Sequence, residues 1–95
     1  MKVIVVATRK EGASPDEFAP HLAAESNHAL GMYRDEIVRE IYSRTDGKGA
    51  VLVLECANEE EAARQVGELP LAKLGLLSFE IYGTAPYRGI VQSVT

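Results

Sequence analysis

The stretch Ala50-Val-Leu-Val-Leu-Glu-Cys56 decides the fold of this chain. Aliphatic side chains occupy both alternating faces of this stretch, so it predicts a β-strand that is buried on both sides. A second run of the same kind, Lys2–Thr8 (KVIVVAT), lies at the start of the sequence. In a chain of 95 residues, two such strands predict a single domain built around one central pair of strands.

The segments around these two strands follow helical and strand patterns in turn. Ser14 with Glu17 three residues later fits a capping box, and Asn58 fits the N-cap of a second helix. The order is β-α-β-β-α-β, which predicts an α+β, ferredoxin-like split βαβ fold with a four-stranded antiparallel sheet. The first and third strands are then central, and the charged second and fourth strands form the edges. The expected strands are 2–8, 37–45, 50–56 and 76–82, the expected helices are 15–34 and 59–69, and a hairpin turn is expected at 46–49.

Two helices can cover only one face of such a sheet, although its central strands are apolar on both faces. The uncovered face needs a partner, and a second copy of the same sheet is the simplest one. We therefore expect a dimeric α+β barrel in which residues 1–95 form one domain. Residues 83–95 form a C-terminal tail that could reach across the subunit interface.

The composition excludes several classes of partner. The net charge of −4 argues against a nucleic-acid or anionic-membrane partner, because both require a basic surface. The sequence shows no signal-peptide pattern and no apolar stretch long enough to span a membrane, so a cytoplasmic location is expected. We find no phosphate-binding loop and no nucleophile elbow, and the single cysteine, Cys56, is expected to be a core residue.

A carboxylate falls in the middle of the apolar face of the first expected helix. At about 100° per residue, Phe18 and Met32 lie on one arc and Glu25 projects near its centre. An unpaired buried carboxylate costs several kcal/mol, so such a group is normally paired, neutralised or functional. Glu25 is therefore a candidate general base. The alternatives are a structural ion pair with Arg39 or Arg44, or a helix rotated so that Glu25 reaches solvent.

Two histidines accompany Glu25 on the same side of this helix. His21, Glu25 and His28 are spaced i, i+4 and i+7. Two histidines and a carboxylate could hold a metal ion, but the spacing differs from the HExxH pattern, and we expect no metal. We favour an acid–base site in which Glu25 is the catalytic base and His28 or His21 donates a hydrogen bond or tunes it.

Three further polar residues lie on the expected strands. Arg39 and Tyr42 belong to the second strand, and an arginine there can bind a substrate carboxylate in a forked arrangement. Glu55 lies on the third strand and shares a face with Val51 and Val53. We predict that Arg39, Tyr42 and Glu55, together with His21, contact substrate. The structural alternatives are that the charge of Arg39 only protects an edge strand from unwanted pairing, and that Glu55 lies in solvent at the end of its strand.

The second half of the chain resembles a known family. The stretch AVLVLECANEEEAARQVGELPLAKLGLLSFEIYGTAPY (50–87) is similar to the muconolactone isomerase-like proteins: a hydrophobic strand, an acid-led helix, a Leu-Pro-Leu stop and a strand before a proline-containing tail. The resemblance implies a ferredoxin-like fold, dimeric barrels and often larger rings. It also implies a cofactor-free proton shift on a small unsaturated lactone or acid, with Glu25 at the position of an acidic base. Developing negative charge would then need a donor such as Arg39, Tyr42 or His28.

Two other functions remain open from the sequence. A cofactor-independent monooxygenase of this architecture would act on aromatic substrates, and the absence of tryptophan weighs against its wide aromatic pocket. A non-catalytic ligand-binding or stress-related dimeric barrel would hold Glu25 in a structural contact without an enclosed cavity. The sequence therefore does not settle whether the chain is an enzyme.

Overall fold

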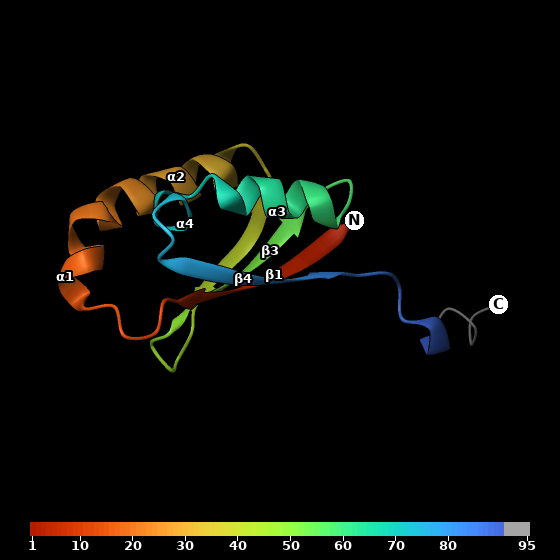
Figure 1. Ribbon diagram of the computed structural model, residues 1–95. Coiled ribbons are helices and arrows are strands. Elements are labelled where there is room, and N and C mark those ends of the chain that lie inside the picture. The colour runs from red at the N-terminus through yellow and green to blue at the C-terminus, as the bar shows by residue number, and fades with distance from the viewer. Residues whose placement is uncertain (91–95) are drawn as a thin grey trace.

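The computed structural model describes residues 1–90 as one layer of helices packed on one sheet (Figure 1). The central strands are β1 (Lys2–Arg9) and β3 (Gly49–Glu55), and the edge strands are β2 (Val38–Ser43) and β4 (Leu77–Gly83). The helices are α1 (Pro15–Phe18), a 3₁₀ turn η1 (Ala19–His21), α2 (Leu22–Arg34), α3 (Glu59–Gly67) and α4 (Pro70–Lys73).

The strand order β2-β3-β1-β4, with every neighbouring pair antiparallel, confirms the predicted fold. Both apolar strands are central and both charged strands are edges. Asn58 caps α3 as predicted, since its Oδ1 accepts a hydrogen bond of 2.8 Å from the backbone N–H of Glu61. No helix among residues 1–90 has both the length and the apolar character that crossing a bilayer requires.

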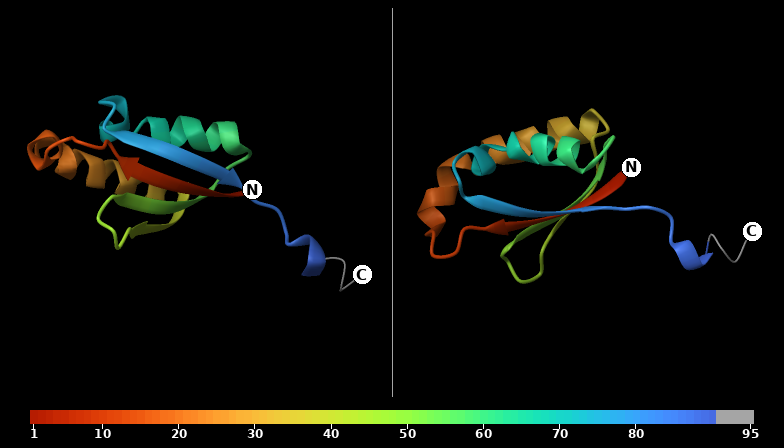
Figure 2. Two further views of the ribbon diagram at one scale, coloured as in Figure 1. Left: turned by 60° about the horizontal axis from the view of Figure 1, so that its bottom comes forward. Right: turned by 45° about the vertical axis from the view of Figure 1, so that its right-hand side comes forward.

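The core lies between the sheet and the helices. Val3, Val5, Leu54 and Val66 are fully buried there, and Cys56 is buried as predicted. Burial is the main reason that the pKa of the Cys56 thiol is raised. The opposite face of the sheet, here called the outer face, carries no helix in any view (Figures 1 and 2). Its central aliphatic side chains are only half-buried; they are Ile4, Val6, Val51 and Val53.

The expected first helix is interrupted. Residues 15–34 were expected to form one helix, but η1 separates α1 from α2 around Pro20. Proline lacks a backbone N–H and clashes with the carbonyl four residues earlier, so the chain tightens into a 3₁₀ turn at this point. Phe18 and Met32, predicted on the apolar arc, are both buried, whereas Tyr33 beside Met32 is 56% exposed.

Two backbone features shape the region beside α2. The junction between α2 and β2 places Glu36 at φ 63°, the left-handed conformation that usually falls to glycine after a helix. In the β2–β3 hairpin, Gly49 approaches β1 so closely that a Cβ atom there would lie 2.0 Å from the carbonyl oxygen of Ala7. Only glycine fits this position, and the close approach sets one wall of the cavity described below.

The C-terminal segment leaves the domain. Thr84 still holds β1 through its hydroxyl, which donates to the carbonyl oxygen of Lys2 at 2.6 Å. Beyond Thr84 the chain runs away from the sheet, and Tyr87 and Ile90 are 74% and 64% exposed (Figure 2). Residues 91–95 of the predicted tail lie outside the described residues.

Candidate active site

A cavity of about 240 Å³ lies between α2 and the helix-covered face of the sheet. Its wall is mostly aliphatic, and four polar or charged side chains also line it. The aliphatic side chains include Leu22, Ile41, Leu52, Leu69, Leu71 and Leu77, and the polar ones are Arg9, Glu25, Ser26 and Ser43. A largely apolar cavity with a few convergent polar groups is the usual form of a small-molecule site.

Glu25 is held at this cavity by a single fixed contact. Its Oε1 accepts a hydrogen bond of 2.9 Å from the backbone N–H of Leu71, in the first turn of α4. Glu25 Oε2 has no hydrogen-bond partner or cation within 4.0 Å among residues 1–90. The side chain is half-buried and lines the cavity, so the helix is not rotated to place Glu25 in open solvent, although part of the side chain still reaches water. One carboxylate oxygen is therefore positioned and the other is available.

The alternative of a structural ion pair with Arg39 or Arg44 is also not found. Arg39 donates from Nε to the carbonyl oxygen of Glu36 at 3.0 Å. Arg44 binds Asp46 at 2.6 Å and the hydroxyl of Thr8 at 2.8 Å, and so ties the β2–β3 hairpin to β1. Neither arginine lines the cavity that contains Glu25.

The cation at this cavity is Arg9, which the sequence analysis missed. Arg9 ends β1 and faces the helices, and its guanidinium carbon lies 4.9 Å from the centroid of the Phe18 ring. No carboxylate among residues 1–90 lies within 4.0 Å of it. The signal was present in the sequence: strand alternation places Arg9 on the same face as Val5 and Ala7, which face the core.

His21 and His28 are not among the residues that line the cavity. Both are half-buried; His21 ends η1 and His28 lies in α2. Residues 1–90 contain no group of three or more His, Cys, Asp or Glu side chains placed to hold a metal ion.

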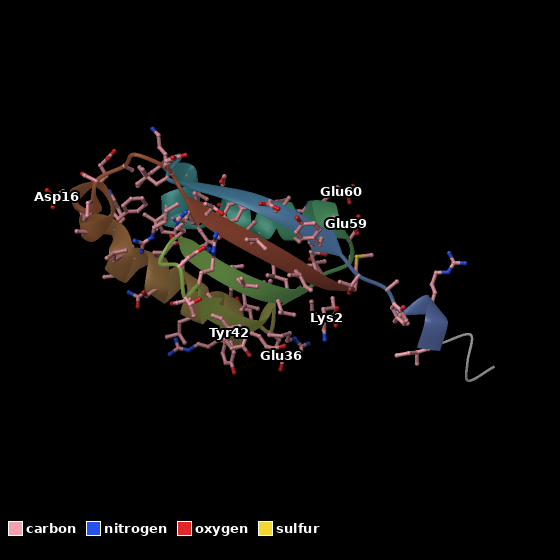
Figure 3. All side chains as sticks on the ribbon, turned by 90° about the horizontal axis from the view of Figure 1, so that it is seen from below. Lys2, Asp16, Glu36, Tyr42, Glu59 and Glu60 are labelled. Atoms are coloured by element: carbon pink, nitrogen blue, oxygen red, sulfur yellow. The ribbon has the colours of Figure 1, made fainter. Side chains whose placement is uncertain are left out.

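Arg39 and Tyr42 lie away from Glu25. A β-bulge between Val38 and Glu40 lets Arg39 turn toward the α2–β2 junction. Tyr42 lies on the outer face at the β2 edge of the sheet, 57% exposed (Figure 3). Its hydroxyl donates to Glu40 Oε1 at 2.7 Å, and this hydrogen bond to a carboxylate raises the pKa of Tyr42.

Glu55 lies at the opposite end of the central strands from Arg9. Its Oε2 is 2.8 Å from the N-terminal amine of Met1. The hydrogen bond from this amine, together with its positive charge, lowers the pKa of Glu55. The structure therefore brings only Glu25, of the six predicted site residues, to the cavity.

The Glu55 contact predicts a pH-dependent contribution to stability. Its pKa in the folded chain lies below the ordinary value of 4.5, so the contribution is present above that value and is lost as the pH falls through the folded pKa. We expect wild type to be more stable than Glu55→Gln near neutral pH, with the difference vanishing as the pH falls through the lowered pKa of Glu55. Urea unfolding of both proteins along this pH series measures it. A difference that persists in acid would show that Glu55 acts through packing instead.

Comparison with known proteins identifies the fold. No protein-family model and no curated protein sequence matches the chain. Among solved structures, the 5-chloro-2-hydroxyhydroquinone dehydrochlorinase TftG from Burkholderia phenoliruptrix AC1100, in complex with 2,5-dihydroxybenzoquinone, is similar with a TM-score of 0.74. The sequence identity is 16%, over 94% of this chain and 98% of that one. At this identity the likeness shows the ferredoxin-like α+β fold, as predicted.

Proposed function

We propose that this chain is a cofactor-free enzyme that moves a proton on a small unsaturated ring compound, a lactone or a related acid, with Glu25 as general base. The observation that carries the proposal is the position of Glu25. One of its oxygens is fixed by the backbone N–H of Leu71, and the other has no partner among residues 1–90 in a largely apolar cavity that also contains a cation, Arg9. A positioned base and a charge-stabilising group are the two parts that a proton shift requires.

The chemistry uses both charged groups. Glu25 removes a proton from a carbon next to a conjugated carbonyl, and the C–H electron pair moves through the conjugated system onto the carbonyl oxygen. Arg9 stabilises the negative charge that develops on that oxygen. The protonated Glu25 then returns the proton to a different carbon of the same system. The double bond has moved, and no atom has been gained or lost.

The size of the cavity supports a substrate with one ring. An apolar cavity of about 150 Å³ is enough for benzene, so about 240 Å³ leaves room for a single ring with a few substituents. The ligand in the similar dehydrochlorinase structure, 2,5-dihydroxybenzoquinone, belongs to this size class. The predicted roles of His21, His28, Arg39, Tyr42 and Glu55 in catalysis or substrate binding stay predictions, as does a cytoplasmic location.

A second candidate, a non-catalytic ligand-binding barrel, is favoured by one specific observation. The hydrogen bond from Leu71 places the Glu25 carboxylate at the start of α4, where a carboxylate also serves as a structural cap. In that case the cavity would bind a ligand without changing it.

We also propose that the chain works as a homodimer or a larger ring. The aliphatic outer face supports this proposal, because the helices leave it uncovered and a second copy of the same sheet would remove it from water. The exposed Tyr87 and Ile90 in the departing C-terminal segment offer further apolar surface to a second copy.

Deuterium exchange tests the function across a panel of candidate substrates. Unsaturated lactones, enoic acids and hydroxylated cyclic enones are incubated with the protein in D₂O and followed by proton NMR. We expect at least one of them to lose a C–H signal next to its carbonyl at least about 100-fold faster than in buffer. If ring compounds shift the resonances of cavity residues but none exchanges, the binding barrel is the better account.

A further inference from the structure

A second hollow, of about 450 Å³, opens beside the cavity that contains Glu25. It lies where the end of β1, the loop that follows it and the β2–β3 hairpin meet. Arg9, Lys10, Glu11, Phe18 and Lys48 are among its lining residues. We call it the outer hollow and the cavity at Glu25 the inner cavity. Arg9 lines both and so marks their boundary.

The outer hollow is positively charged in a chain whose net charge is −4. Lys10 and Lys48 line it with Arg9, and none of the three has a carboxylate within 4.0 Å among residues 1–90. Glu11 is the only carboxylate among its lining residues. The hollow therefore has three cations against one carboxylate.

Asp46, in the adjoining hairpin, does not cancel this excess. It is paired with Arg44 at 2.6 Å, and its Oδ1 accepts the backbone N–H of Lys48 at 2.8 Å. The hydrogen bond from Lys48 and then the one from Arg44 lower the pKa of Asp46, so it stays ionised at neutral pH. Neither Arg44 nor Asp46 lines the hollow, and because the two charges of this pair balance each other, the excess of positive charge remains.

We propose that the outer hollow is a binding site for the carboxylate of an anionic ligand whose ring occupies the inner cavity. The proposal rests on the proposed function for the placement of the ring. Arg9 at the boundary would contact the ligand where its ring meets its anionic substituent, while Lys10 and Lys48 attract the carboxylate from solvent. The substrate class is thus a small unsaturated ring acid rather than a neutral lactone.

Matched acid and amide probes test this assignment. Benzoate, phenylacetate and 3-phenylpropionate are titrated into the full-length protein beside benzamide, phenylacetamide and 3-phenylpropanamide, and dissociation constants are taken from backbone amide shifts in NMR. Each pair has nearly the same shape and differs in charge. We expect the best acid to bind about tenfold more tightly than its amide at low salt, with a smaller ratio at high salt. The length of the best acid reports the distance from the ring to the cations.

Lysine variants locate the effect. Lys10→Gln/Lys48→Gln is expected to lower the acid-to-amide ratio to about twofold while leaving amide binding unchanged. Lys2→Gln removes the same kind of charge at the other end of β1 and is expected to keep the full ratio. Thermal unfolding of each variant checks that it is folded.

The outcomes separate this proposal from the proposed function. Proton exchange on neutral lactones together with equal affinity for acids and amides would overturn the anionic site and leave the proton-shift function standing. A preference for the acid that depends on Lys10 and Lys48, without proton exchange on any compound, would support the carboxylate-binding site and overturn the proposed enzymatic function. A preference that survives in the double variant and disappears in Lys2→Gln would place anion binding elsewhere.

Discussion

Replacing Glu25 with glutamine is expected to lower the turnover of an exchanging substrate about 100- to 10,000-fold, the usual contribution of a positioned general base. Glutamine has the same shape as glutamate and cannot accept a proton from carbon at neutral pH. Its Oε1 can still accept the hydrogen bond from the backbone N–H of Leu71, so the start of α4 keeps its contact. The turnover number should fall while the Michaelis constant changes little, because the ring still fits the cavity.

A second substitution at the same position separates catalysis from a structural role. Glu25→Ala removes both the base and the hydrogen-bond acceptor, and loss of a cap of this kind costs about 0.5–2 kcal/mol of stability. We therefore expect both variants to be inactive, and only Glu25→Ala to unfold at clearly lower urea concentration. Glu60→Gln, on the exposed start of α3, removes one carboxylate far from the cavity and should match wild type in both measurements.

The opposite pattern would contradict the proposed base. If Glu25→Gln keeps its activity and Glu25→Ala loses stability, Glu25 is a structural cap and the reaction has another base. Activity and unfolding must therefore be measured on the same preparations, since a loss of activity alone does not distinguish a missing base from a partly unfolded protein.

The fold could be predicted from the sequence because strong local patterns decide it. The aliphatic runs around Val5 and Leu52 require burial on both faces, and only central strands provide it. The break around Pro20 was equally available in the sequence, but the apolar spacing across it was regular enough to suggest one helix. Regular spacing reports which side chains face the core, whereas the missing N–H of proline decides whether the hydrogen bonds can continue.

The site was less predictable because it depends on contacts between distant segments. Glu25 could be singled out from its helical phase alone. Its partner, the backbone N–H of Leu71, lies 46 residues away and belongs to a short helix that begins at a proline expected only to end one. Arg39 illustrates the reverse: a β-bulge, which the sequence pattern did not show, turns it toward the carbonyl oxygen of Glu36.

The second prediction with a large expected effect concerns association through the outer face of the sheet. If the proposed homodimer or ring forms through this face, Val53→Glu is expected to convert it into a monomer, because an uncompensated charge buried between two sheets costs several kcal/mol. In the separate chain Val53 is only half-buried, so the glutamate can reach water and the monomer should still fold. Sedimentation velocity at several protein concentrations measures the change, and circular dichroism reports the fold.

The control places the same charge where the fold does not require a partner. Ala63 is exposed on α3, on the helix side of the sheet, and Ala63→Glu changes the net charge by the same amount as Val53→Glu. It should associate as wild type does, which would exclude general charge repulsion as the cause. If Val53→Glu associates like Ala63→Glu, the outer face is not the contact between copies. Tyr42 lies on the outer face with Val53, whereas Glu25 lines the inner cavity on the helix-covered face. Val53→Glu therefore leaves the inner cavity itself unchanged, and ligand binding by its monomer would show whether that cavity works without a second copy.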